Sequence, residues 1–328
     1  MVKFSYFLGS EQWQPEEIIN HTKLAKNAGF DMVTISEHFH PWVDDQSASN
    51  FAWATLGAIT SVAPDLDLGT GVTTPLWRMH PAIVAQASAT IDRLSNSTFH
   101  LGVGTGENLN EGPLGYSFPP YAERAARMKE ALFIIRSLLD GEKLDFNGEY
   151  YSTEKAKLYS PPRKNVPIWL AAGGPKSAQL ASEYTDGLMI SVKDPNEAYE
   201  RVIEPSNAKS KELKKDNLRI HTYRWTVFAE NEEDAWKALG PWRGLRAPGR
   251  LEAKDPAVLR EAADNMERSE ILNKYSIAGN IKEIIDIYKP LVTEFNSEII
   301  TIQIASANQE KTIELLGDEV LPALKKLQ

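Results

Sequence analysis

Residues 2–13, VKFSYFLGSEQW, decide between two parallel α/β folds. The run at 2–7 is typical of a strand, and the apolar residues of 15–28 recur at the spacing of an amphipathic helix. An open doubly wound sheet usually carries a G-x-G-x-x-G turn after its first strand, because these glycines admit a nucleotide phosphate to the helix N-terminus. The turn LGSEQW at 8–13 lacks that pattern. The stretch therefore favours a (β/α)8 barrel over an open sheet.

Strand-like runs alternate with amphipathic segments along the rest of the chain. The predicted strands are 2–7, 32–35, 65–70, 98–103, 166–171, 187–191, 218–228 and 297–304, and the helices between them include 15–28, 51–60, 81–94, 121–139 and 176–184. Eight strands separated by helices fit a parallel sheet closed into a barrel. We expect one barrel domain over 1–328, with insertions at about 140–163 and 236–274.

The composition limits the classes of partner. The 328 residues include 45 acidic and 36 basic side chains, a net charge of −9 that argues against broad binding to nucleic acid or anionic membrane. The absence of cysteine excludes disulfides, thiolate metal sites and thiol nucleophiles. The first 13 residues contain no apolar run of the kind found in signal peptides or membrane spans, so we expect a cytoplasmic protein.

Polar and glycine-rich loops follow several predicted strands. They read SEHFHPW at 36–42, GVTTP at 71–75, GTGENLNE at 104–111 and AGGPK at 172–176. Active sites of (β/α)8 barrels lie at the carboxyl ends of the strands. We therefore expect these loops to surround one functional site.

His38 and His40 admit three interpretations. Imidazoles can bind a metal, but no H-x-x-x-H pattern or third histidine ligand accompanies them. Imidazole can also act as a general base near neutral pH. The third possibility is a structural histidine packed beside Phe39 and Trp42.

Glu107 follows a predicted strand and lies between Gly106 and Asn108. Small neighbouring residues would let a flat ligand approach the backbone closely. A carboxyl group beside an apolar ring can act as an acid, whereas a plain loop carboxylate could simply cap the next helix.

Together these loops resemble the F420-dependent glucose-6-phosphate dehydrogenases of the luciferase-like barrel superfamily. The similarity is carried by SEHFHPW at 36–42, TP at 74–75 with Arg78, PAIVAQ at 81–86, GVGTGE at 102–107, NE at 110–111 and AAGGP at 171–175. It covers nearly the whole chain, with order and spacing kept. The resemblance implies a luciferase-like barrel, coenzyme F420, a homodimer, no metal, and oxidation of a sugar 6-phosphate such as glucose 6-phosphate.

The resemblance also implies roles for individual residues. His38 would take the proton of the substrate hydroxyl, Glu107 would supply a proton to the reduced deazaflavin, and Trp42 would pack at the reacting centre. The implied cofactor-binding residues are Glu37, Gly71, Val72, Thr74, Gly106, Asn110, Ala172, Gly173 and Gly174. Glu37 stands where the family usually has Asp, and the Gly71–Val72 bond would be a non-proline cis peptide.

The substrate is the more open question. The phosphate-binding positions of the sugar-phosphate enzymes fall on Ser191, Lys193, Arg250 and Lys274, which could hold a phosphate dianion through charge-assisted hydrogen bonds. Alternatively, these cations are solvated surface residues. The similar F420-dependent secondary-alcohol dehydrogenases share the catalytic residues but tend to lack the basic set. An FMN-dependent luciferase-like monooxygenase and a non-catalytic F420-binding protein are further alternatives.

Overall fold

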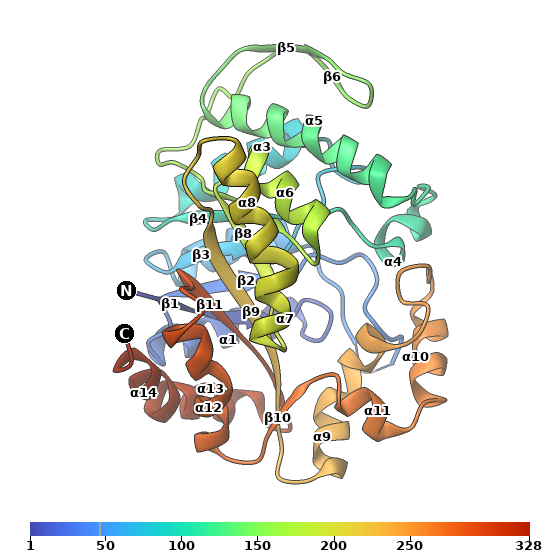
Figure 1. Ribbon diagram of the computed structural model, residues 1–328, viewed down its shortest axis with the longest axis vertical. Helices are drawn as coiled ribbons and strands as arrows, with labels where there is room; N and C mark the ends of the chain where they lie inside the picture. Colours follow the sequence, from blue (N-terminus) through green and yellow to red (C-terminus); the bar gives the residue numbers. More distant parts are fainter. Residues whose placement is uncertain (46) are drawn as a thin grey trace.

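Eight parallel strands close into a barrel in the computed structural model, which describes residues 1–45 and 47–328 (Figure 1). Around the barrel the order is β9-β11-β1-β2-β3-β4-β7-β8, and pairing of β8 with β9 completes the ring. These strands are β1 (Lys3–Leu8), β2 (Met32–Ile35), β3 (Asp67–Thr70), β4 (Phe99–Val103), β7 (Ile168–Ala171), β8 (Gly187–Ser191), β9 (Arg219–Phe228) and β11 (Ile299–Ser306). The predicted barrel is confirmed.

Each predicted barrel strand overlaps an observed one, and the differences are confined to the ends. The third strand begins at Asp67 instead of residue 65, and the last extends to Ser306 instead of ending at 304. The sequence analysis missed β10 (Ser276–Ala278), which pairs with the carboxyl end of β9 outside the ring. Three residues are too short a run to show a strand pattern.

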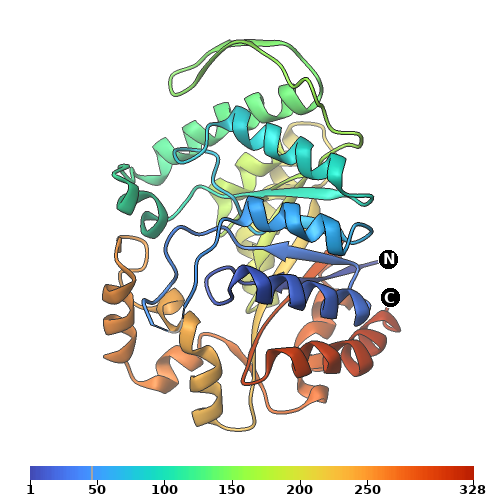
Figure 2. The ribbon, with the colours of Figure 1, turned by 180° about the vertical axis from the view of Figure 1, so that it is seen from behind.

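Helices cover the outside of the barrel (Figure 2). The α-helices are α1 (Pro15–Asn27), α2 (Ala52–Val62), α3 (Pro81–Leu94), α4 (Asn108–Glu111), α5 (Tyr121–Leu139), α6 (Pro175–Tyr184), α7 (Pro195–Ala198), α8 (Glu204–Glu212), α9 (Glu232–Leu239), α10 (Pro256–Asp264), α11 (Arg268–Leu272), α12 (Ile281–Thr293), α13 (Gln309–Leu315) and α14 (Leu321–Lys325). Short 3-10 turns lie at Gly112–Leu114 and Gly240–Arg246, and π-turns at Tyr199–Ile203 and Leu316–Val320. Gly29, with φ +85°, lies just past the end of α1.

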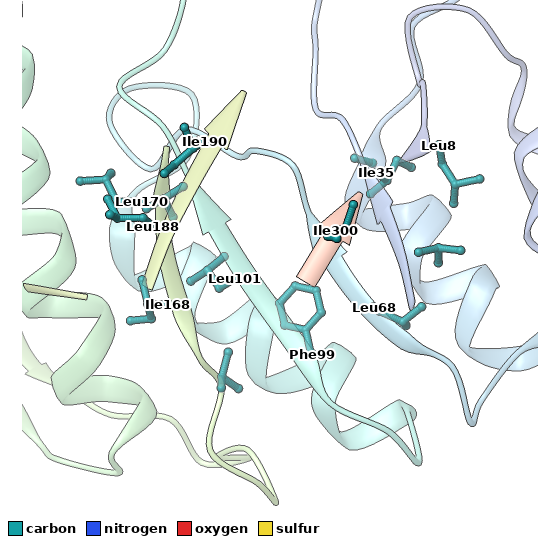
Figure 3. Packing of buried hydrophobic residues seen from close by; sticks show 14 of the residues in the cluster. Leu8, Ile35, Leu68, Phe99, Leu101, Ile168, Leu170, Leu188, Ile190 and Ile300 are labelled. Carbon is teal, nitrogen blue, oxygen red and sulfur yellow. The ribbon is translucent and has the colours of Figure 1, made fainter. Parts of the chain in front are cut away.

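Successive side chains of each barrel strand point alternately outward and inward, and so contribute to two separate hydrophobic cores. The outward side chains, such as Leu68, Leu101 and Leu170, belong to one large cluster with the inner faces of the surrounding helices (Figure 3). Complete burial of each leucine contributes about 1.5–3 kcal/mol. The inward side chains of the same strands form a second cluster, which includes Trp169 and Tyr223.

The inward side chains fill the middle of the barrel. The indole Nε1 of Trp169 donates to Nδ1 of His100 at 3.1 Å, and His221 stacks on Tyr223 with ring centroids 4.7 Å apart. Burial lowers the pKa of His221 well below its ordinary value, so it packs as a neutral ring. A Cβ added to Gly71 would lie 2.6 Å from the Tyr223 hydroxyl oxygen, so this packed layer reaches the loop after β3.

The two stretches that were predicted to be insertions contain additional strands and helices. Within 140–163 the strands β5 (Leu144–Asn147) and β6 (Ser152–Ala156) form an antiparallel hairpin. The stretch 236–274 contains most of α9 together with α10 and α11, which lie on the same side of the barrel as α4 (Figures 1 and 2). In the described part of the chain, no helix combines the length and apolar character that a membrane crossing requires.

Candidate functional site

A cavity of about 450 Å³ opens at the carboxyl ends of the strands. It is lined by loops that follow β1, β2, β3, β4 and β7 and by part of the stretch 236–274. The predicted site residues that line it are Glu37, His38, Trp42, Gly71, Val72, Thr74, Gly106, Glu107, Asn110, Ala172, Gly173, Ser191 and Arg250. Residues far apart in the sequence thus meet in the one site that the strand ends predicted.

The His38 ring is held in one orientation. Its Nδ1 lies 2.9 Å from the carbonyl oxygen of His40, and a carbonyl only accepts, so Nδ1 carries hydrogen. When the ring is neutral, Nε2 is therefore the atom with the free lone pair, and it belongs to the cavity wall. This geometry suits a general base.

Two carboxylates face Nε2 of His38. Oε1 of Glu11 lies 3.3 Å away and Oε2 of Glu107 lies 3.6 Å away. Glu11 is 2% exposed, and its other oxygen accepts hydrogen bonds from the hydroxyls of Ser36 and Ser10. Three titratable groups that meet at one point can share and pass protons. Sequence analysis missed Glu11, although it is the acidic residue of the loop after the first strand.

Glu107 is not a capping residue. It occupies the N-cap position of α4, but its side chain makes no hydrogen bond to that helix. Instead, Oε1 accepts from Nη1 of Arg250 at 3.1 Å, and the carboxylate is 26% exposed at the cavity wall. The simpler interpretation of this residue, a helix cap, is therefore wrong.

Aromatic side chains form the other side of the cavity. Trp42 is almost fully buried, and its ring centroid lies 5.0 Å from that of His38. Phe7, Trp225 and Trp242 continue this wall, with the centroids of the last two 4.6 Å apart. Four aromatic rings therefore form part of the cavity wall, and only Trp42 was predicted from the sequence.

Glu37 belongs to a buried charged triad with Arg78 and Glu111. One oxygen of Glu37 accepts from the hydroxyl of Thr73 and the backbone amide of Thr74, and the other lies 2.9 Å from Nη1 of Arg78. Arg78 Nε lies 3.3 Å from Oε2 of Glu111. Burial raises the pKa of Glu111 to about 7, against the opposing effect of Arg78.

Glycines and a cis peptide lie in the loops that form one part of the cavity wall. The Gly71–Val72 bond is cis, as the family resemblance implied. A Cβ at Gly104 would lie 2.6 Å from the Val72 side chain, and one at Gly106, where φ is +80°, would lie 3.1 Å from Thr74. Glycine at these positions lets Val72 and Thr74 pack directly against the backbone, and Gly71, Gly104 and Gly106 all line the cavity.

The N-terminus of α6 opens beside this surface. Gly174 is its N-cap and offers no side chain to the first backbone amides, and Gly173 lines the cavity. Added Cβ atoms at both glycines would meet nothing within 4 Å. Free amides at the start of a ten-residue helix suit an anionic group.

Asn110 supports the histidine loop. Its Oδ1 accepts from the backbone amides of Phe39 at 2.8 Å and His40 at 3.3 Å. The His40 ring faces away from the cavity, with Nδ1 3.1 Å from the carbonyl oxygen of Lys254. Within the described residues, no group of three or more His, Cys, Asp or Glu side chains is arranged to hold a metal.

The predicted phosphate-binding residues are divided between two places. Ser191 and Arg250 line the cavity, whereas Lys193 and Lys274 do not. The exposed ammonium of Lys193 donates to the carbonyl oxygen of Asn273, and that of Lys274 donates to the carbonyl of Arg246 at 3.0 Å. The four side chains do not converge on one point.

Comparison with known proteins agrees with this geometry. Residues 2–289 match the luciferase-like monooxygenase family. A protein of Mycolicibacterium gilvum named F420-dependent glucose-6-phosphate dehydrogenase is 31% identical over 99% of both chains. An F420-dependent hydroxymycolic acid dehydrogenase of Mycobacterium tuberculosis is 34% identical over 82% of this chain and 74% of its own.

A solved structure is also similar over the whole chain. It is an F420-dependent secondary alcohol dehydrogenase in complex with an F420-acetone adduct, with a TM-score of 0.92, 29% identity and 99% of both chains covered. The likeness therefore covers nearly the whole chain.

Proposed function

Because the chain belongs to the luciferase-like monooxygenase family, we propose that it is an F420-dependent dehydrogenase that oxidises a CH–OH group to a carbonyl. The observation that carries the proposal is the position of His38. Its Nε2 lies at the cavity wall between the carboxylates of Glu11 and Glu107, in a chain about 30% identical to enzymes named for F420.

The cavity fits a deazaflavin cofactor. A flat ring would lie against the part of the cavity wall that Gly71, Val72, Gly104 and Gly106 form, next to the cis peptide. Glu37, Thr74, Asn110 and Ala172 would border it, and the amides at Gly173 and Gly174 would hold its phosphate. When bound, F420 supplies the hydride acceptor.

The chain's own residues then hold and move protons. Nε2 of His38 removes the proton of the substrate hydroxyl while the hydride leaves the carbon, and Glu11 stabilises the imidazolium that results. A proton held on the Glu107 carboxyl is delivered on the cofactor side of the cavity. Trp42, against His38, excludes water from the reacting centre.

The first substrate candidate is a sugar 6-phosphate. Relatives of nearly the same length carry the name glucose-6-phosphate dehydrogenase. Ser191 and Arg250 at the wall, with Lys193 and Lys274 turned inward, would hold the phosphate.

A neutral secondary alcohol is the second candidate, and the contacts of the cations favour it. Among the described residues, Arg250 is the one Lys or Arg side chain in the cavity lining, and it already pairs with Glu107. Both lysine ammonium groups bind backbone carbonyls outside the lining. The wall beside His38 is aromatic, which suits alkyl groups.

The test follows the absorbance of oxidised F420 with glucose 6-phosphate, glucose and isopropanol in parallel. Loss of absorbance with any of them supports the dehydrogenase, and the responding alcohol identifies the substrate class. Binding of F420 without turnover of any alcohol would contradict the proposed activity.

We further propose that the protein is a single (β/α)8 domain that forms a homodimer in the cytoplasm. The family resemblance supports the dimer, and the acidic composition without cysteine supports the location. Light scattering on the purified protein measures its mass in solution. A mass near 36.6 kDa, in place of twice that value, would contradict the homodimer.

A further inference from the structure

We propose that Arg250 is a positioning residue for Glu107, committed to the carboxyl group and not to a substrate phosphate. The inference rests on the proposed dehydrogenase function and assigns Arg250 a different partner from the one the family resemblance implied. It follows from three features: the contacts of Arg250, the segment that carries it, and the charges around Glu107.

The contacts of Arg250 join three residues of the reacting centre. Its Nη1 donates to Oε1 of Glu107 at 3.1 Å, while Oε2 of the same carboxylate lies 3.6 Å from Nε2 of His38. Its Cζ lies 5.9 Å from the ring centroid of Trp42. A guanidinium with one fixed hydrogen bond and an aromatic neighbour holds the carboxylate in a defined direction.

The segment 240–254 is fastened to the loop that carries His38 and Trp42. A Cβ at Gly244 would collide with the carbonyl oxygen of Trp42, so backbone packs on backbone here. Arg243 donates to Asp45 at 2.9 Å and to Asp264 at 2.9 Å.

The same segment is also fastened to the loop that carries Glu107. Nδ2 of Asn108 donates to the carbonyl oxygen of Glu252 at 2.6 Å, and Gly112 packs against Lys254. The segment therefore contacts both catalytic loops. Figures 1 and 2 show α10, which follows this segment, on the same side of the barrel as α4. Arg250 follows Gly249, whose φ of +73° turns the chain toward the cavity.

The charges around Glu107 give Arg250 its role. The groups that face this carboxylate are His38 after β2, Arg250, and Arg124 of α5, whose Nη1 donates to the Gly106 carbonyl at 3.4 Å. Oε1 of Glu11 lies 3.3 Å from the same Nε2 of His38. Without Arg250, the carboxylates of Glu11 and Glu107 would compete for the imidazole of His38. Glu107 would also lose the hydrogen bond from Arg250 that holds its carboxylate apart from that of Glu11.

The first experiment compares steady-state kinetics of Arg250→Ala, Arg250→Lys and the wild type with the best neutral alcohol. Loss of the contact should lower kcat by about 10²-fold, the scale of a misplaced catalytic group, with KM changed less than about twofold. The fall in kcat without a matching change in KM separates a misplaced carboxyl group from a lost substrate contact. Arg250→Lys should restore part of kcat.

A matched control is Arg268→Ala. Arg268 lies on the same inserted stretch and pairs with Glu233 at 2.6 Å on the surface. It should leave kcat and KM unchanged.

A second experiment measures binding without turnover. Calorimetry with inorganic phosphate should give tighter binding to Glu107→Gln than to the wild type, by about tenfold, because the released guanidinium can then take an anion. The F420 dissociation constant, followed by tryptophan fluorescence, should stay within about twofold in Arg250→Ala, since the residue does not hold the cofactor.

The outcomes separate the inference from the proposed function. A raised KM for glucose 6-phosphate with unchanged kcat in Arg250→Ala would make Arg250 a phosphate ligand and overturn the inference alone. Equal phosphate binding by Glu107→Gln and the wild type would also overturn it. Absence of F420 reduction by the wild type with every alcohol would instead remove the dehydrogenase itself.

Discussion

Nε2 of His38 lies 3.3 Å from Oε1 of Glu11, a carboxylate that is 2% exposed and bound through its other oxygen to Ser36. The pair couples the loops after β1 and β2, so both ring nitrogens of the proposed base have a partner: Nε2 contacts Glu11 and Nδ1 contacts the His40 carbonyl. A buried carboxylate next to an imidazole stabilises the positive charge that proton transfer creates.

Glu11→Gln should therefore slow turnover. We expect kcat to fall about tenfold or more, since loss of about 1.4 kcal/mol of transition-state stabilisation costs a factor of ten. Glu16→Gln, on the exposed face of α1, is the matched control. Equal kcat in Glu11→Gln and the control would remove Glu11 from the reaction.

His38→Ala should keep the cofactor and lose the reaction. The expected loss in kcat is about 10²–10⁴-fold, the contribution of a positioned general base. Fluorescence titration with F420 should give the wild-type dissociation constant, because Nε2 faces the alcohol. Undiminished turnover would assign proton removal to another group.

Glu111→Gln should change the pH dependence of stability. The pKa of Glu111 rises from 4.5 in the unfolded chain to about 7 in the fold, so its contribution is fully present below pH 4.5 and is lost as pH rises to 7. Glutamine cannot ionise, so the free energy of unfolding of the variant, relative to wild type, should be higher at pH 8 than at pH 5 by on the order of 1–3 kcal/mol. Urea unfolding at both pH values measures this difference. The same difference in free energy of unfolding between variant and wild type at pH 5 and pH 8 would contradict the raised pKa of Glu111.

Lys274→Ala tests the phosphate site independently of Arg250. If the lysine leaves the Arg246 carbonyl to bind a phosphate, its loss should raise KM for glucose 6-phosphate several-fold, about the scale of one charge-assisted hydrogen bond. KM for isopropanol and the affinity for F420 should not change. Equal KM for the phosphate ester in both proteins would count against a phosphate site built on Lys274.

The barrel could be predicted because its signal is local and repeated. Each strand reads as a short apolar run followed by a polar or glycine loop, and the loops at 36–42 and 104–111 meet because parallel strands end on one side. The pairing of Arg250 with Glu107 could not be predicted, since it joins residues 143 positions apart through an inserted stretch. Glu11 was not predicted because the loop 8–13 was considered only for its lack of a G-x-G-x-x-G pattern.

The packed layer of Trp169, His100, His221 and Tyr223 fills the barrel interior and reaches Gly71 in the cavity wall, so it blocks passage through the barrel on that side. We expect a ring that lies against Gly71–Val72 to bind before the alcohol and to leave after the ketone or lactone. We expect compulsory-order kinetics, in which the oxidised product competes with the alcohol for the loaded enzyme, and initial-rate inhibition patterns reveal that order.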